Sequence, residues 1–479
     1  MILRVINHPY EFDMKNLCIT FFPHEKIRLE GEEDPVVVTT RRETDGSFFV
    51  SAKVYDVYRE TTAKPEPVDE EHLVLSVTLY RLLSGILGFA PPWGVLYGVR
   101  PAKLMHRLCA QMGDDAAVAH FQTAFLTQKS KAELAHEVML HENRSIARSG
   151  PKSFSLYVSI PFCPTRCAYC SFVSHSIEKT HKLMTPYVDL LLRELEETAK
   201  YAKELGLELA TVYFGGGTPT TLSAQDLGRI FSTIEQNFDL SHLMEYTVEA
   251  GRPDTVTRER LEVIRAAGVQ RISINPQSFN DKVLEAIGRR HTAQQTLDAF
   301  ALARDCGFDH INMDFIAGLP EDDLQSFQRS IQTALDLQAE SITVHTLALK
   351  TSAYMVTREQ TFDLKDRLTV SNMVDYAGQT LHGAGYYPYY MYRQSKSLGN
   401  LENVGWCKPG YDCLYNVYMM DETHTVLAVG AGAVTKLRGQ NSGMIERIYN
   451  YKYPYEYIRD FDTLLERKKR IPGFYAEYD

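Results

Sequence analysis

Long hydrophobic runs are missing from this chain of 479 residues. No stretch approaches the roughly 18 consecutive apolar residues of a membrane-spanning helix, so we expect no membrane span. The first ten residues also lack the basic segment, apolar run and small-residue cleavage site of a secretory signal. These absences predict a cytoplasmic protein.

A surplus of positive charge is missing as well. The chain has 51 Lys and Arg against 61 Asp and Glu, which gives a formal charge of -10. Such a chain repels phosphate backbones, and we expect no nucleic-acid partner. The 29 Gly and 20 Pro are dispersed, which excludes collagen-like and low-complexity classes.

Cysteine is sparse, and its distribution is uneven. Three of the eight cysteines, Cys163, Cys167 and Cys170, fall within eight residues. Disulfides are rare in a reducing compartment, and so tight a group is typical of metal ligands rather than of a disulfide framework.

The N-terminal part, residues 1–150, is predicted to be an α+β domain of unassigned role. Strands are expected at Leu17–Phe22, Val36–Thr40 and Phe48–Val54, with a hairpin turn at Asp45-Gly46. From residue 72 to about 146, apolar residues recur every three or four positions and predict helices. Pro101 is placed to begin one of them.

Apolar runs then alternate with amphipathic runs across residues 151–350. The expected strands are Phe154–Ile160, Ala210–Phe214, Glu245–Glu249, Arg271–Ile274, Ile311–Ile316 and Ile342–His345. Six strands with helices between them predict a parallel sheet curled into a partial (β/α)6 barrel, an α/β fold with chemistry at the strand C-termini. Residues 351–479 are expected to form a C-terminal α+β domain that covers the substrate, with a long loop over Gly383–Gly410.

The three grouped cysteines lie three and then two residues apart, directly after the first expected strand of the barrel. A structural zinc site needs four ligands, and His175 or a distant Cys would have to complete it. Three ligands without a fourth leave one metal position open for chemistry. The place at a strand end favours this second interpretation.

Other polar groups follow the later strands. Gly216, Gly217 and Thr218 end the second strand, where glycines let the backbone approach a ligand closely. Near further strand ends lie acceptors for hydroxyl groups and a cation for a carboxylate. These residues are Glu249, Gln277, Arg289 and Asp314.

The cysteine motif, with Tyr169 before its last Cys, resembles that of the radical S-adenosylmethionine superfamily. The resemblance implies a TIM-like partial barrel and a 4Fe-4S cluster held by Cys163, Cys167 and Cys170. It also implies that S-adenosylmethionine chelates the fourth iron and is cleaved reductively to a 5'-deoxyadenosyl radical.

Within that superfamily the chain resembles the oxygen-independent coproporphyrinogen III oxidase family. The likeness rests on Gln277-Ser278-Phe279, on Arg289 twelve residues after Gln277, and on Asp314 before Gly318-Leu319-Pro320. It implies the following S-adenosylmethionine-binding residues: Tyr157, Tyr169, Gly216, Gly217, Thr218, Glu249, Gln277, Arg289, Asp314 and Ala348.

The resemblance implies oxidative decarboxylation of coproporphyrinogen III, a tetrapyrrole, with electrons from a flavodoxin- or ferredoxin-type donor. Two departures leave alternatives open. Ser171-Phe172-Val173 stands where oxidases of the family have a further Cys, and Tyr415-Asn416 stands where heme-chaperone relatives have a His-Asn heme motif. A heme chaperone and a radical enzyme acting on heme are the alternative functions.

Four substrate carboxylates would need cations. The candidates, each as readily a solvated surface charge, are Arg166, Arg290, Arg393, Lys396 and Lys408. A tyrosine group could line the face of a tetrapyrrole or serve only for packing; it comprises Tyr387, Tyr389, Tyr390 and Tyr392.

Overall fold

The computed structural model describes residues 1–23, 25–170, 175–348, 364–394 and 396–479. Its backbone contacts divide the chain into two units. Unit 1 holds residues 1–139 and the described parts of 359–371 and 391–403, and unit 2 holds the other described residues. The expected boundary at residues 350/351 lies outside the described residues, and the three-domain division stays a prediction.

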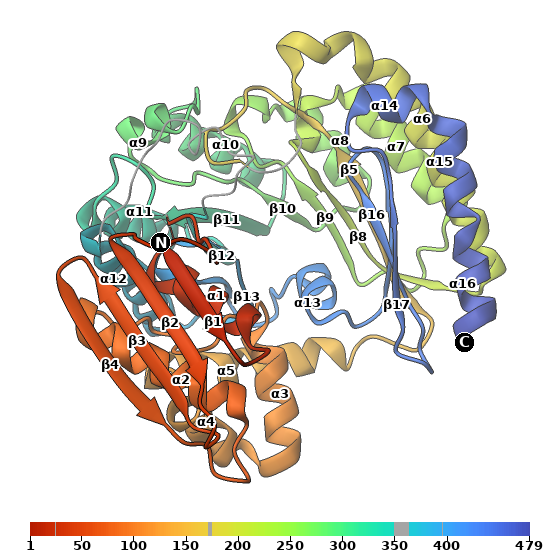
Figure 1. Ribbon diagram of the computed structural model, residues 1–479. Helices are drawn as coiled ribbons and strands as arrows, with labels where there is room; N and C mark the ends of the chain where they lie inside the picture. The colour runs from red at the N-terminus through yellow and green to blue at the C-terminus, as the bar shows by residue number, and fades with distance from the viewer. Residues whose placement is uncertain (24, 171–174, 349–363, 395) are drawn as a thin grey trace. The chain divides into compact units, whose positions relative to one another are not determined.

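No helix within these described ranges is long and apolar enough to cross a membrane. Figure 1 follows the chain from the N-terminal sheet to the C-terminal helices.

Unit 1 begins with a four-stranded sheet in the order β1-β2-β3-β4. The strands are β1 (Ile2–Ile6), β2 (Val36–Arg42), β3 (Phe48–Val54) and β4 (Val57–Ala63). β1 pairs with β2 in parallel, and β2, β3 and β4 are antiparallel. The predicted turn is confirmed: Gly46 has φ 84°, and its N–H donates to the carbonyl of Glu43 at 3.1 Å.

One expected strand of this unit is wrong. Leu17–Phe22 belongs almost entirely to a helix, α1 (Glu11–Phe21), which packs in the core with α2 (Glu71–Leu87). Its buried residues Met14, Leu17, Cys18 and Phe21 are three and four positions apart, the spacing of one helix face. The short apolar run taken alone concealed that period.

The helices predicted over residues 72–146 are confirmed. After α2 come α3 (Pro101–Met112), α4 (Asp114–Thr123) and α5 (Lys129–Ile146). Pro101 is the first residue of α3, where its missing N–H costs no helical hydrogen bond.

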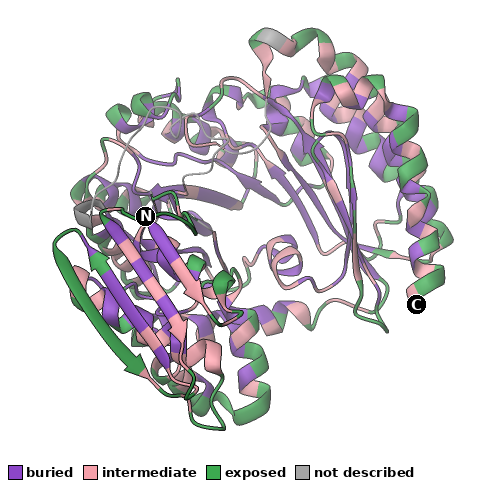
Figure 2. Ribbon diagram, viewed as in Figure 1, coloured by how far each residue is buried: buried purple, intermediate pink, exposed green. Residues whose placement is uncertain are grey.

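The large sheet has eleven strands in the order β13-β14-β12-β11-β10-β9-β8-β5-β15-β16-β17. Its middle is the predicted parallel set: β5 (Ser153–Ile160), β8 (Glu208–Gly216), β9 (Glu245–Glu249), β10 (Arg271–Ser273), β11 (His310–Ala317) and β12 (Ser341–Thr346). Neighbours among these six strands all pair in parallel. Their residues are mostly buried, as the purple ribbon of Figure 2 shows.

Helices alternate with these strands along the chain. They are α6 (Ile177–Glu204), α7 (Ala224–Asn237), α8 (Arg258–Ala266), the short α9 (Asp281–Ala286), α10 (Ala293–Asp305) and α11 (Leu324–Asp336). Side-chain oxygens of Ser223, Thr257, Thr292 and Asp323 cap α7, α8, α10 and α11 by accepting a backbone N–H. These caps explain where the four helices begin.

The loop expected over Gly383–Gly410 is wrong, because it contains β13 (Tyr387–Arg393) and β14 (Glu402–Cys407), preceded by α12 (Leu364–Gly383). A Cβ on Gly405 would lie 2.0 Å from the Tyr390 ring. This glycine therefore makes room for an aromatic ring within a strand and does not mark a turn.

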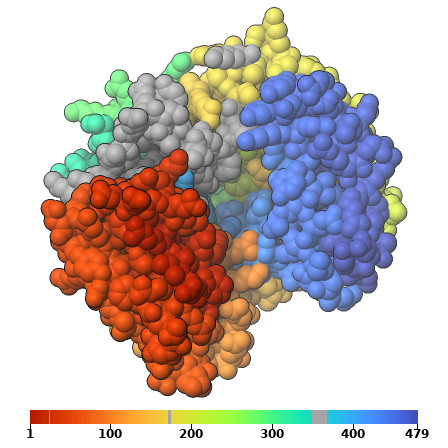
Figure 3. All heavy atoms as spheres, in the orientation of Figure 1, coloured from red at the N-terminus to blue at the C-terminus, as the bar shows by residue number. Residues whose placement is uncertain are grey.

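The other edge of the sheet continues with β15 (Thr425–Val429), parallel to β5, and with the antiparallel β16 (Val434–Arg438) and β17 (Ile445–Tyr449). The chain ends in α14 (Pro454–Arg459), α15 (Phe461–Lys468) and α16 (Arg470–Tyr478). These segments form the blue surface of Figure 3. The expected α+β character of the C-terminal part is thus confirmed for its described residues.

Candidate active site

The C-terminal ends of the six parallel strands lie along one edge of the sheet. Ile160 pairs with Gly216, Ser273 with Glu249, and Ala317 with Thr346, so adjacent strands end at similar heights. The predicted site residues lie in the C-terminal halves of these strands or in the segments that follow them, all within unit 2. The fold therefore brings them to a common edge, as parallel β/α architecture requires.

The cluster loop, residues 163–170, follows β5. Cys163 lies in the short strand β6 (Phe162–Cys163), which pairs with β7 (His175–Ser176). At the other end of the loop the N–H of Ala168 donates to the carbonyl of Ile287 at 2.9 Å. Cys167 is buried, whereas Cys163 and Cys170 are half-buried. Three thiols on one tethered loop fit a metal cluster that keeps one position open.

The glycine run packs directly against this loop. The N–H of Gly217 donates to the carbonyl of Ile160 at 2.7 Å, and that of Thr218 donates to the carbonyl of Phe162 at 2.8 Å. A Cβ on Gly217 would lie 2.5 Å from the Phe162 oxygen and 3.0 Å from the Cys163 sulfur. Glycine is thus required for the approach of the two loops, independently of any ligand. The predicted contact of Gly216–Thr218 with S-adenosylmethionine stays a prediction.

Arg252 is a residue of this site that the sequence analysis missed. It is 3% exposed, and its guanidinium forms two hydrogen bonds with Asp254, at 2.9 and 2.8 Å. It also donates to the Thr165 hydroxyl at 3.2 Å and to the Cys167 sulfur at 3.6 Å. A buried positive charge beside a cysteine sulfur stabilises negative charge there. Its position three residues after the end of β9 is the feature of the sequence that could have identified it.

Arg289 and Tyr169, both predicted, meet beside the same loop. The Arg289 guanidinium donates to the carbonyl of Asn275 at 2.6 Å and to the Tyr169 hydroxyl at 3.2 Å. Burial raises the pKa of the Tyr169 phenol well above its ordinary value, so the phenol stays neutral. The pair connects the cluster loop to the segment after β10.

Glu249 lies at the end of β9, next to a group of stacked tyrosine rings. The Tyr213 hydroxyl donates to its carboxylate at 2.6 Å, and the Tyr213 ring stacks on Tyr415 at a centroid distance of 4.3 Å. Tyr157 stacks against both rings, at 6.2 and 5.8 Å. Burial raises the pKa of Glu249 to about 7, against the hydrogen bond from Tyr213, which lowers it. Tyr213 and Tyr415 were not predicted, because their contact depends on tertiary structure.

Asp314 lies in β11, where its carboxylate accepts from the Asn312 amide at 2.7 Å and lies 3.9 Å from the His345 ring. Burial raises its pKa, but the contacts with His345 and Asn312 outweigh burial and hold the pKa below its ordinary value. Glu249 and Asp314 therefore differ in charge near neutral pH.

Gln277 and Ala348 lie near the same strand ends. Gln277 has φ 67°, and its N–H donates to the Asp314 carbonyl at 2.9 Å. Ala348 follows the end of β12 and is half-buried.

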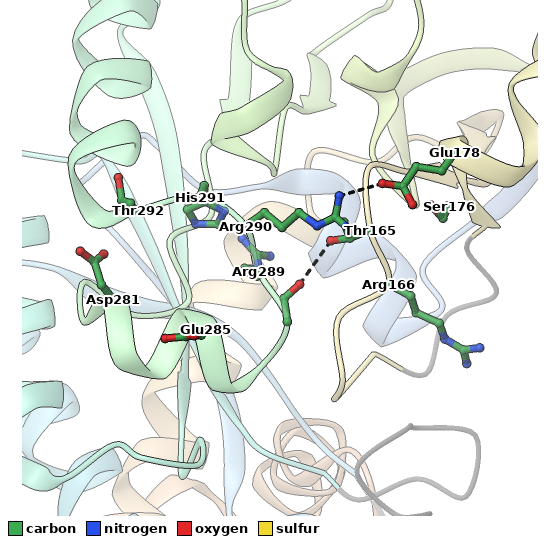
Figure 4. Close-up of a pocket in the computed structure, with 11 residues that line it drawn as sticks. Thr165, Arg166, Ser176, Glu178, Asp281, Glu285, Arg289, Arg290, His291 and Thr292 are labelled. Carbon is green, nitrogen blue, oxygen red and sulfur yellow. Dashed lines mark hydrogen bonds and ion pairs between the residues drawn. The ribbon is translucent and has the colours of Figure 1, made fainter.

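A pocket of about 760 Å³ opens beside the cluster loop (Figure 4). Arg166 and Arg290, two of the candidate cations, line it, and Arg290 pairs with Glu178 at 2.7 Å. His291 forms part of its wall and is 3% exposed. Burial lowers the pKa of His291 to about 3, so the ring is neutral.

The other residues expected to bind the substrate do not line this pocket. Arg393 is buried and donates to the carbonyls of Leu96 and Asn400, and Lys408 donates to the carbonyl of Gln338. Lys396 is exposed. Of the tyrosines, Tyr389 and Tyr390 are buried, Tyr387 donates to Asp412, and Tyr392 accepts from Gln394. Ser171–Val173, the departure from the oxidase motif, lies outside the described residues.

Comparison with known proteins identifies the class to which this site belongs. Residues 157–334 match the family model of the radical SAM superfamily, and they include the cluster loop and the strand ends through Asp314. The protein is thus a radical S-adenosylmethionine oxidoreductase, and its cofactors are a 4Fe-4S cluster and S-adenosylmethionine. The zinc alternative for the cluster loop is thereby set aside.

The relatives define the family more closely. The chain is 34% identical over 470 residues to the oxygen-independent coproporphyrinogen-III oxidase-like protein HemZ of Bacillus subtilis (strain 168), covering 95% of this chain and 94% of HemZ. It belongs to this oxidase-like family. It is also 30% identical over 320 residues to the heme chaperone HemW of Haemophilus influenzae, covering 66% of this chain and 78% of HemW.

A solved structure confirms the predicted fold. The coproporphyrinogen III oxidase HemN of Escherichia coli, described as a radical SAM enzyme, superposes with a TM-score of 0.50 and 22% sequence identity. The match covers 68% of this chain and 72% of HemN.

Proposed function

We propose that this protein catalyses the oxygen-independent oxidative decarboxylation of coproporphyrinogen III in heme biosynthesis. Two propionate side chains become vinyl groups, which gives protoporphyrinogen IX. At each propionate one hydrogen atom leaves the β-carbon, carbon dioxide leaves the carboxylate, and one electron passes to an acceptor. A one-electron donor of flavodoxin or ferredoxin type supplies the reductant for each turnover.

The chain's own residues would hold the cofactors and shield the reaction. Cys163, Cys167 and Cys170 hold the cluster, which together with S-adenosylmethionine supplies a 5'-deoxyadenosyl radical when both are bound. Gly216 to Thr218 lie against the cluster loop, and Glu249 and Asp314 offer acceptors for ribose hydroxyls. Attack on an unactivated C–H bond requires such fixed positions and the exclusion of water.

The observation that carries this proposal is the similarity to an oxygen-independent coproporphyrinogen-III oxidase-like protein along 95% of the chain, unit 1 included. Arg166 and Arg290, in the pocket beside the cluster loop, are the candidate cations for propionate groups. We expect their conversion to glutamine to raise the KM for coproporphyrinogen more than it lowers kcat, because they would bind carboxylates and not the reacting carbon.

A heme chaperone is the second candidate, favoured by the similarity to HemW over 66% of the chain. Against it stands Tyr415, at the position where the heme motif of such chaperones has histidine. Its ring is buried and stacks with those of Tyr157 and Tyr213, and burial raises the pKa of its phenol well above the ordinary value. A neutral, stacked phenol is a poor axial ligand for heme iron.

The deciding experiment incubates the iron-reconstituted protein with dithionite, S-adenosylmethionine and coproporphyrinogen III without oxygen, and follows the products by mass spectrometry. We expect protoporphyrinogen and 5'-deoxyadenosine, both absent in Cys163→Ala and retained in Cys306→Ser, a matched change in a half-buried thiol elsewhere. Stoichiometric heme binding without decarboxylation would favour the chaperone, and consumption of added heme under reduction would favour a radical enzyme acting on heme.

A further inference from the structure

A second cluster of metal-ligating side chains lies in unit 1, outside the radical SAM region. Cys109, Asp114 and His136 each offer one ligand atom, and these three atoms all lie within 4.8 Å of one another. The His136 ring nitrogen is 3.0 Å from an Asp114 carboxylate oxygen. The nearest of these residues is 27 positions from Cys163 in the sequence, and the cofactors proposed above use none of them.

Three helices bring these residues together. Cys109 lies in the last turn of α3, Asp114 is the first residue of α4, and His136 lies in the middle of α5. The chain passes from α3 to α4 through Gly113 alone, at φ 86°, a conformation that favours glycine. This one-residue connection places the thiol close to the carboxylate.

The packing of these helices fixes the directions of the side chains. Leu108, Ala117 and Ala135, each next to or one turn from a ligand residue, are buried, with at most 7% exposure. Cys109 is half-buried, whereas the side chains of Asp114 and His136 are 54% and 23% exposed. The three donors thus form a corner that is closed by protein on one side and open to water on the other.

From this geometry we propose that Cys109, Asp114 and His136 bind a zinc ion. Thiolate sulfur, imidazole nitrogen and carboxylate oxygen are the three ligand types that Zn²⁺ takes in proteins, whereas magnesium and calcium prefer oxygen alone. Water from the open side supplies the fourth ligand. The ion ties the end of α3 and the start of α4 to α5, and so stabilises unit 1 independently of the iron-sulfur cluster.

A simpler arrangement would be a metal-free one, in which the Asp114 carboxylate forms hydrogen bonds with His136 and with the Cys109 thiol. The two arrangements differ in what they bind. The hydrogen bonds need no metal, and their loss leaves the zinc content of the protein unchanged. Zinc ligation instead requires the sulfur and the imidazole together.

The test measures zinc and iron in the cluster-loaded, full-length protein by inductively coupled plasma mass spectrometry after incubation with zinc sulfate and desalting. We expect one zinc per chain in addition to the cluster iron. Cys109→Ser and His136→Gln should weaken zinc binding by more than about 100-fold, since each loses a direct ligand, and leave the iron content unchanged. Cys163→Ala should lose iron and keep zinc.

Two control variants match the chemistry at other sites. Cys306→Ser removes another half-buried thiol, and His242→Gln removes an exposed imidazole on a different element; both should keep full zinc. X-ray absorption at the zinc edge should show one sulfur at about 2.3 Å in the wild type. That sulfur should be absent from any zinc that Cys109→Ser retains.

Zinc below one tenth of an equivalent in the wild type would overturn the proposal, and so would unchanged zinc in the folded Cys109→Ser/His136→Gln double variant. Circular dichroism of each variant establishes that it is folded. If a ligand variant unfolds, the sulfur signal at the zinc edge of the wild-type protein, present or absent, decides the question by itself.

Discussion

The ionisation of Glu249 should control the affinity for S-adenosylmethionine near neutral pH. Burial raises the pKa of Glu249 to about 7, so the fully ionised carboxylate exists only above that pH. If the carboxylate accepts ribose hydroxyls, as proposed, binding weakens as the group takes up a proton. The ionised fraction falls from about nine tenths at pH 8 to about one tenth at pH 6, so the Kd should rise about tenfold.

The hydrogen bond from Tyr213, 2.6 Å long, allows this pKa to be moved. A hydrogen bond to a charged group contributes about 1.5–3 kcal/mol, so Tyr213→Phe should raise the pKa of Glu249 by about one to two pH units. The ring that stacks on Tyr415 is retained in this variant. The midpoint of the affinity curve should therefore move to about pH 8–9.

The assay is equilibrium dialysis of labelled S-adenosylmethionine against cluster-loaded protein between pH 5.5 and 9.5. Glu249→Gln cannot ionise at this position, so its curve of affinity against pH shows any titration of the ligand itself. The ratio of the wild-type curve to this curve gives the contribution of Glu249. Glu259→Gln, an exposed carboxylate on α8, should behave as the wild type. A wild-type affinity without a midpoint between pH 5.5 and 9.5, or a slope that persists unchanged in Glu249→Gln, would refute the reasoning.

Three further predictions concern the cluster loop and the core. Gly217→Ala should lower the iron content and destabilise the protein by about 1–3 kcal/mol, since its Cβ would lie 2.5 Å from the backbone oxygen of Phe162, directly before the cluster loop; iron analysis and urea unfolding measure both. Arg252→Gln removes a charge beside the Cys167 sulfur, so a redox titration followed by electron paramagnetic resonance should give a more negative cluster potential. Lys468→Met leaves the fully buried carboxylate of Glu194, 2.8 Å away, without a counter-charge and should cost about 3–5 kcal/mol in urea unfolding.

Each of these predictions has a matched control. Gly228→Ala lies within α7, where the nearest atom to the new Cβ is 3.7 Å away, and should keep its iron. Arg258→Gln alters an exposed arginine on α8 and should leave the potential unchanged. Lys200→Met breaks an exposed ion pair worth at most about 1 kcal/mol. Losses in the controls equal to those in the test variants would contradict the structural reasons given.

The parallel strands were predictable because burial on both faces leaves continuous apolar runs in the sequence, and the capping side chains mark the helices between them. The two wrong predictions of secondary structure fall where one local sequence pattern is compatible with two structures. Leu17–Phe22, apolar except for Thr20, is too short to distinguish a strand from a helix face. Residues such as Gly405 and Tyr390 are typical of a loop in the sequence. In the structure the Tyr390 ring occupies the space that a side chain at position 405 would need.

In the candidate site, too, some features could be predicted from the sequence and others could not. The positions of Cys163, Glu249 and Gln277 follow from strand ends, which the sequence marks. The contacts of Tyr415 with Tyr213, and of Arg252 with the cluster loop, join segments far apart in the chain. No local pattern encodes such contacts, so they could be found only from the folded structure.

The two hydrogen bonds from Gly217 and Thr218 to the backbone around the cluster loop have a consequence for maturation. Together with the bond from Ala168 to Ile287, at the end of α9, they fix both ends of the loop through hydrogen bonds between backbone groups. These bonds involve protein groups alone, so part of the entropy of ordering this loop is lost when the chain folds. The polypeptide can therefore fold first and then bind a preassembled cluster as a late step of its biogenesis.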